Sequence, residues 1–126
     1  MTLGSAQLVA FAGATDLGRA RDFYEDVLGL PLETEDGFAC MFRVGDTRLR
    51  VTRVDEVVPA PYTVLGWTVP DIETAIRELS TRGVEFQRYE GMGQDELGAW
   101  SAPSGARVAW FTDPDGNTLS IQQMPA

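Results

Sequence analysis

The 126-residue chain carries one pattern twice, and this internal repeat constrains the fold more than any other feature. In each half, an apolar stretch is followed by an aspartate, then by apolar residues at helical spacing, then by a glycine. Asp16 therefore matches Asp71, and Gly29 matches Gly83 to within one residue. One such half is too short to bury its own strands. We therefore expect two modules that form a single α+β domain over residues 1–126.

The first module is expected to cover about residues 7–55. Its apolar stretch, 8–14, is typical of a strand. Apolar residues three and four positions apart indicate a helix over 17–28, which begins after the capping residue Asp16. Residues 38–44 and 48–54 are predicted to be strands joined by a tight turn. The prolines that follow, within 57–61, indicate a linker.

The second module is expected to cover about residues 63–124. Its helix should begin at Ile72 and end before Gly83. Strands are predicted over 63–69, 84–89, 107–112 and 118–123. The stretch 91–105 is rich in Gly, Ser and Pro, and we expect it to be a lid, a binding loop or simply a long connection. The second half thus follows the order strand–helix–strand–strand–strand, and we expect the same order in the first half.

Charge and composition exclude several functions. The chain has 19 acidic residues, ten arginines and no lysine or histidine, for a net charge of −9. Phosphate backbones and anionic lipids repel such a chain, so we expect neither a nucleic-acid nor a membrane partner. The missing histidine and lysine exclude histidine-based catalysis, histidine metal sites and a lysine Schiff base. The single cysteine, Cys40, is compatible with a reducing cytoplasm, where we expect the protein to act.

Two motifs identify a family resemblance. Residues 23–30 read FYEDVLGL, and residues 110–119 read WFTDPDGNTL. Both resemble signatures of the vicinal oxygen chelate superfamily, which includes glyoxalase I, bleomycin resistance proteins and extradiol dioxygenases. The motifs, their order and the repeat cover nearly the whole chain. The resemblance implies two βαβββ modules that form a cupped mixed β-sheet, with the ligand held on the open face of the cup.

The resemblance also implies where metal-dependent relatives hold their ion. The four corresponding positions here are Val9, Arg50, Val64 and Ser120. Valine has no donor atom, arginine is a permanent cation, and serine alone is a weak neutral ligand. We therefore expect no metal and no other cofactor. The metal-dependent chemistry of the family is not expected either.

Strand alternation around these positions predicts which side chains line the cup. They combine an apolar wall with arginines and neutral polar groups. The predicted ligand-binding set is Phe11, Met41, Arg43, Arg50, Thr52, Trp100, Trp110, Ser120 and Gln122.

Some members of this set have an alternative interpretation. Trp110 either lines the cup or packs beneath the sheet, and Trp100 either closes over the cup or rests on the surface. Arg43 and Arg50 either bind an anionic group or pair with acids such as Glu33 or Asp46. Cys40 and Trp67 are expected in the core.

Three functions fit these observations. The first is a metal-free protein that binds a small, partly aromatic molecule. The second is a metal-independent isomerase or lyase, in which a carboxylate or tyrosine moves a proton and Arg50 stabilises an oxyanion. The third is a non-catalytic module that binds a partner protein. We expect a homodimer and assign no catalytic residue. The acidic surface favours a cationic ligand, whereas Arg43 and Arg50 favour an anionic or phenolic one.

Overall fold

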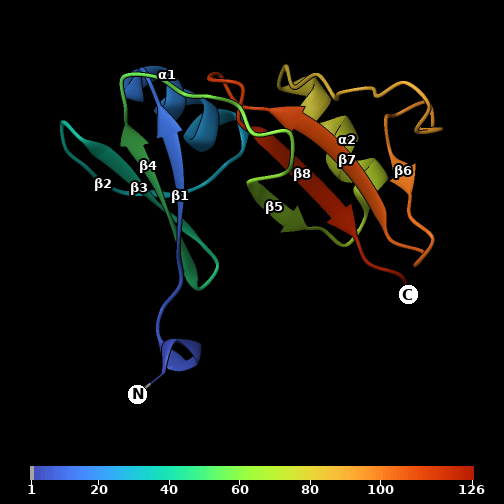
Figure 1. Cartoon of the computed structure of the whole chain (residues 1–126), viewed down its shortest axis with the longest axis horizontal. Coiled ribbons are helices and arrows are strands. Elements are labelled where there is room, and N and C mark those ends of the chain that lie inside the picture. The colour runs from blue at the N-terminus through green and yellow to red at the C-terminus, as the bar shows by residue number, and fades with distance from the viewer. Residues whose placement is uncertain (1) are drawn as a thin grey trace. The chain divides into compact units, whose positions relative to one another are not determined.

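A computed structural model describes residues 2–126, and it separates into two compact units (Figure 1). The first unit ends at Val57, and the second is Val58–Ala126. The two predicted modules, 7–55 and 63–124, fall within these units. In the part of the chain described, no helix is long and apolar enough to cross a membrane.

The first unit is a four-stranded sheet with helical turns packed on one face. The strand order is β1-β4-β3-β2, with β1 parallel to β4 and the other neighbours antiparallel. The parallel pair requires a crossover, which the helical segment after β1 supplies. The elements are η1 (Leu3–Ser5), β1 (Val9–Ala14), α1 (Leu17–Arg21), η2 (Asp22–Val27), β2 (Leu32–Glu35), β3 (Ala39–Val44) and β4 (Thr47–Arg53).

The helix predicted over 17–28 changes type along its length. Asp16 begins it, because its carboxylate accepts a hydrogen bond from the Arg19 N–H at 3.1 Å. After one α-helical turn, the segment η2 is a π-helix, closed by a bond from the Leu28 N–H to the Phe23 carbonyl. Gly29 then adopts a φ of 77°, which ends the helix. Apolar spacing of three and four residues locates this helix but does not distinguish its two types.

The second unit repeats this topology (Figure 1). The strand order is β5-β8-β7-β6, with β5 parallel to β8. Its elements are β5 (Leu65–Thr68), α2 (Ile72–Thr81), β6 (Trp100–Ser101), β7 (Arg107–Thr112) and β8 (Thr118–Gln123). Two mixed four-stranded sheets with few helices confirm the predicted α+β class for the described residues.

The strand predicted over 84–89 is wrong. This segment makes a backbone bond to β7 from the Gln87 N–H to the Trp110 carbonyl, at 2.7 Å, but no regular ladder. The reason is local, because the Gln94 side chain accepts from the Tyr89 N–H and donates to the Gln87 carbonyl. Those backbone groups are therefore satisfied without a strand partner. The strand beside β7 is instead β6, which lies in the stretch expected to be irregular.

Each unit buries the helix-facing side of its sheet. Phe42 and Phe111 occupy matching positions of the repeat, and both are almost fully buried. Phe42 packs on Tyr24 with ring centroids 5.8 Å apart, and Phe111 packs on Phe86 at 5.5 Å. Cys40 is also buried, as predicted.

Core packing gives the first testable prediction. Replacing Phe42 by alanine should lower the free energy of unfolding by about 3–5 kcal/mol, because the substitution leaves a cavity against Tyr24. Phe38→Ala is the matched control, since Phe38 is 76% exposed and its loss should change stability by less than about 0.5 kcal/mol. Urea unfolding measures both variants. Equal losses would contradict the assignment of Phe42 to the core.

Candidate functional site

The outer face of the first sheet, opposite the helix, carries the residues predicted for that half. The strand register aligns Phe11 of β1, Arg50 of β4 and Met41 of β3 in one row. A neighbouring row contains Arg48 and Arg43, and Thr52 lies on the same face. Burial alternates accordingly along β4, where Leu49 and Val51 are buried and Arg48, Arg50 and Thr52 are half-buried.

The arginines of this face differ in their partners. Arg48 forms an ion pair with Glu33. Within residues 2–126, neither Arg43 nor Arg50 takes part in an ion pair or a side-chain hydrogen bond. The pairing of Arg43 or Arg50 with Glu33 or Asp46, which the sequence left open, is therefore not present. Two guanidinium groups on this face remain available to an anion.

Arg50 does exert a longer-range influence on Asp36. The pKa of Asp36 is lowered, first by hydrogen bonds from the backbone N–H groups of Phe38 and Ala39, and further by the positive charge of Arg50. Because Oδ1 of Asp36 accepts both backbone bonds, this carboxylate holds the turn between β2 and β3.

The outer face of the second sheet carries the other predicted residues. Gly66, Ser120 and Trp110 lie in one row across β5, β8 and β7. A Cβ at Gly66 would lie 3.1 Å from the Ser120 Oγ, so glycine makes room for the serine. In the next row, Gln122 donates a hydrogen bond to the Thr68 hydroxyl at 3.2 Å.

A cavity of about 450 Å³ opens on the second unit beside Trp110. Three of the residues that line it are aromatic, and we call it the aromatic cavity. Its lining residues are Pro61, Tyr62, Thr63, Tyr89, Met92, Trp110 and Thr118. Trp110 therefore faces a cavity and is not packed beneath the sheet. Its ring meets Tyr89 edge-on at a centroid distance of 5.6 Å and lies 6.0 Å from the ring of Trp100.

Sequence reasoning missed most of this lining. Trp110 was predicted, but Tyr62, Tyr89 and Met92 were not. Tyr62 lies just after the proline-rich linker, and the Thr118 hydroxyl bonds to the Ala60 carbonyl there. Tyr89 was assigned to a strand, and Met92 lies in the glycine-rich stretch. The sequence signal that could have identified these residues is the presence of aromatic and methionine side chains in segments without a regular apolar pattern.

Polar contacts fix the loop that brings Tyr89 and Met92 to the cavity. The Asp95 carboxylate pairs with Arg107 at 2.8 Å and accepts hydrogen bonds from the N–H groups of Leu97 and Ala99. Burial alone would raise the pKa of Asp95, but these bonds, that from Ala99 foremost, lower it. Arg88 donates to the Asp95 carbonyl at 2.7 Å. The wall of the cavity is therefore held in place by charged groups that do not line it.

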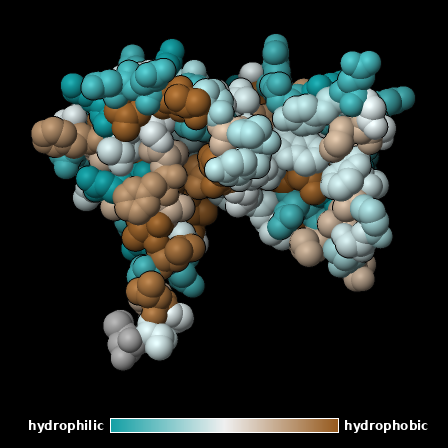
Figure 2. All heavy atoms as spheres, in the orientation of Figure 1, coloured by the Kyte–Doolittle hydropathy of each residue, from teal (hydrophilic) through white to brown (hydrophobic). Residues whose placement is uncertain are grey.

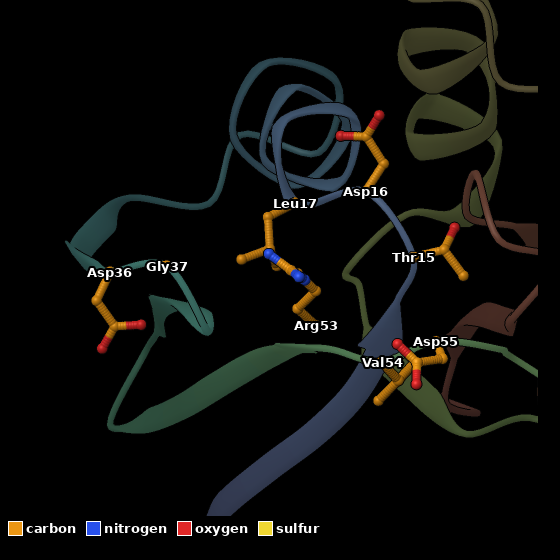
Figure 3. Close-up of a pocket in the computed structure, with 8 residues that line it drawn as sticks. All are labelled: Thr15, Asp16, Leu17, Asp36, Gly37, Arg53, Val54 and Asp55. Atoms are coloured by element: carbon orange, nitrogen blue, oxygen red, sulfur yellow. The ribbon is translucent and has the colours of Figure 1, made fainter.

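A second cavity, of about 540 Å³, lies in the first unit and was not predicted (Figure 3). Its side chains come from the segment joining β1 to α1, the turn between β2 and β3, and the end of β4. They include three carboxylates, Asp16, Asp36 and Asp55, with Arg53. Asp16 and Asp36 already accept backbone hydrogen bonds, as described above, so this polar cavity has a structural explanation.

Cys40 is not placed for nucleophilic chemistry. Burial raises the pKa of its thiol to about 11, and the Glu35 carboxylate, 3.7 Å from Sγ, acts in the same direction. A thiol in this setting stays protonated at neutral pH.

The four positions that would correspond to metal ligands do not fit a divalent cation. Val9 offers no donor atom, and Arg50 places a positive charge among Phe11 and Met41. In the second unit, Val64 is equally without a donor, and Ser120 stands beside Gly66 and Trp110. Across residues 2–126, no three His, Cys, Asp or Glu side chains gather closely enough to hold a metal ion.

Comparisons with known proteins identify a matching family and a similar protein. The family model for the Glyoxalase/Bleomycin resistance protein/Dioxygenase superfamily matches residues 7–121. The uncharacterized protein YraH of Bacillus subtilis (strain 168) is 30% identical over 125 residues, which cover 86% of this chain and 91% of YraH.

Two solved structures share the fold at low sequence identity. A bleomycin resistance determinant encoded on the transposon Tn5 has a TM-score of 0.74 at 18% identity, covering 97% of this chain and 100% of its own. TnmS3, an antibiotic binding protein from Streptomyces sp. CB03234, has a TM-score of 0.71 at 22% identity, covering 97% of each chain. At these identities the matches show the fold alone.

Proposed function

This chain belongs to the glyoxalase/bleomycin resistance protein/dioxygenase superfamily, and we propose that it binds a small, partly aromatic molecule without a metal ion. The observation that carries the proposal is the aromatic cavity of the second unit. TnmS3, which shares the fold, is an antibiotic binding protein, and this precedent supports binding as the activity.

The aromatic cavity has the size and lining of a small-molecule site. Its volume of about 450 Å³ lies within the range of typical ligand pockets, roughly 300–1,000 Å³. Tyr62, Tyr89 and Trp110 offer ring faces and edges, and Met92 is an adaptable apolar neighbour. The hydroxyls of Thr63 and Thr118 supply the few polar groups that orient a bound molecule. A flat, partly aromatic ligand matches this combination best.

The outer sheet faces supply the remaining proposed contacts. In the second unit, Trp100, Ser120 and Gln122 lie on the same sheet face as Trp110. In the first unit we propose contacts from the predicted residues of its outer face, Phe11, Met41, Arg43, Arg50 and Thr52. Apolar surfaces with a few placed polar groups support ligand binding on each face.

We further propose a homodimer that acts in the cytoplasm. A single, buried, free cysteine supports a reducing compartment. Apolar surface is exposed at the start of β1, an edge strand of the first sheet, where Leu8, the residue before the strand, is 70% exposed (Figure 2). Exposed apolar residues on a sheet edge support association with a second chain.

Sedimentation velocity tests the dimer. We expect a species of twice the mass of one chain at micromolar concentration, and Leu8→Glu should shift it toward the monomer, because a charge cannot be buried unpaired at an interface. Leu3→Glu is the matched control, since Leu3 is also exposed but lies in η1, five residues before Leu8. A monomer at every concentration would refute the dimer.

Metal content tests the absence of a metal. Tag-free protein is incubated with zinc, nickel, manganese or iron(II), desalted and analysed by elemental mass spectrometry. We expect less than about a tenth of an equivalent of each metal, because the candidate positions offer no set of donors. One stoichiometric metal would contradict this part of the proposal and would make the family's metal-dependent activities the leading candidates.

Substitution of Trp110 tests the cavity. A library of flat aromatic compounds is screened by tryptophan fluorescence, and the affinity of a hit is measured by calorimetry. Trp110→Leu should weaken binding about tenfold, because it removes the ring that stacks on the ligand. Trp67→Phe is the matched control, since Trp67 lies beside Ile121 on the helix-facing side of the sheet, where it is half-buried and not in the core as predicted. An equal effect of both substitutions would place the ligand elsewhere.

A further inference from the structure

We propose that the outer sheet face of the first unit, by itself, binds a planar aromatic acid and recognises its carboxylate. The inference rests on the proposed function for the existence of an aromatic ligand, and it adds the sign and chemistry of the ligand's charged group. The sequence left the sign of the ligand's charge open, because the acidic surface favours a cationic ligand whereas Arg43 and Arg50 favour an anionic one.

The positive charges of this face are concentrated by the strand register. Arg43 lies directly across from Arg48, and Arg50 lies two positions further along β4. Arg43 and Arg50 are thus diagonal neighbours, whose Cα atoms lie roughly 7–8 Å apart in ordinary sheet geometry. At this spacing, both guanidinium groups can reach one small anion. Glu33 neutralises Arg48 alone. The described residues therefore leave two adjacent guanidinium groups without a partner.

Among the described residues, Arg43 and Arg50 have no acidic partner, although the chain carries 19 acidic residues. Elsewhere in the structure, Arg21 pairs with Glu35, and Arg107 pairs with Asp95. Like charges side by side on a sheet repel each other, so the unpaired arginines are unfavourable until an anion lies between them. A carboxylate suits this position, because guanidinium groups bind it through two parallel hydrogen bonds.

The negative net charge of the chain does not prevent an anionic ligand from binding to this face. The net charge of −9 is spread over the surface, and exposed charges are screened beyond about 8 Å at physiological ionic strength. The sign at the binding face is therefore decided by the groups on that face. Asp36, whose pKa the charge of Arg50 helps to lower, forms no ion pair with it, and its Oδ1 is bonded to two backbone N–H groups.

Apolar side chains beside Arg50 define the rest of the ligand. Phe11 and Met41 flank Arg50 in the same row, and Phe11 is 62% exposed. A flat ring lying on Phe11 and Met41 would place its carboxylate at Arg50 and Arg43. An aromatic acid thus covers the exposed phenylalanine and neutralises the arginines together.

Three naphthalene probes that differ in charge test the inference. They are 2-naphthoate, 2-naphthylmethanol and 2-naphthylmethylammonium, each titrated into the full chain at pH 7 and followed by calorimetry. We expect 2-naphthoate to bind about tenfold more tightly than the alcohol, and more tightly still than the ammonium compound. In ¹⁵N-labelled protein, the side-chain Nε–Hε signals of Arg43 and Arg50 should shift with 2-naphthoate alone.

Single substitutions locate the effect. Arg50→Gln and Arg43→Gln should each weaken 2-naphthoate about tenfold and leave the alcohol unchanged, because each removes a charge-assisted hydrogen bond. Arg53→Gln is the matched control, since Arg53 is on the same strand but lines the polar cavity shown in Figure 3. Thermal unfolding verifies that each variant is folded. Because Arg43 is exposed, Arg43→Gln should perturb folding less than Arg50→Gln does.

The outcomes separate this inference from the proposed function. If the probes bind without preference for the anion, or if Arg43→Gln and Arg50→Gln behave like Arg53→Gln, the carboxylate assignment is overturned while aromatic binding stands. If no probe binds at millimolar concentration, both are overturned. Preference for 2-naphthoate that is lost in Arg50→Gln or Arg43→Gln, and kept in Arg53→Gln, supports both.

Discussion

Burial of one face of each four-stranded sheet is the constraint on which the rest of this structure depends. Side chains alternate between the two faces of a strand, so packing Phe42, Leu49 and Val51 against the helix of the first unit commits their neighbours to the outer face. Phe111, Leu119 and Ile121 impose the same division in the second unit. The residues proposed to contact ligand lie, for the most part, on the faces that this packing leaves uncovered.

The two outer faces have different chemistry. In the first unit, unpaired Arg43 and Arg50 stand beside exposed Phe11, whereas in the second unit Trp110 borders a cavity walled by Tyr62 and Tyr89. The first face is suited to a charged group and the second to an aromatic body. The four positions that the family resemblance assigns to metal ligands, Val9, Arg50, Val64 and Ser120, do not offer a set of donors that fits a divalent cation. Each face by itself supports the proposed binding of a small molecule, through guanidinium groups in the first unit and aromatic rings in the second.

Prediction from sequence succeeded where local pattern and burial agree, and failed where a side chain replaced a backbone partner. The bounds predicted for strands β3, β4, β7 and β8 are correct to within one or two residues. In these strands, the alternation of apolar and polar residues follows the alternation of buried and exposed side chains. The segment 84–89 has the composition of a strand, yet Gln94, several residues away, takes up its backbone groups. The same loop places Tyr89 and Met92 at the cavity, so the failure to predict these two residues and the wrong strand have one cause.

The duplicated module, the α+β class and the family follow from spacing and motifs along the chain, and so does the orientation of the residues in β3, β4 and β8. The absence of histidine and lysine also excludes the chemistry of those residues. Tertiary packing settled that Glu33 pairs with Arg48 and leaves Arg43 and Arg50 unpaired, and that Trp110 borders a cavity. Such choices depend on distances between side chains of separate strands and loops, and periodicity along the chain carries no information about those distances.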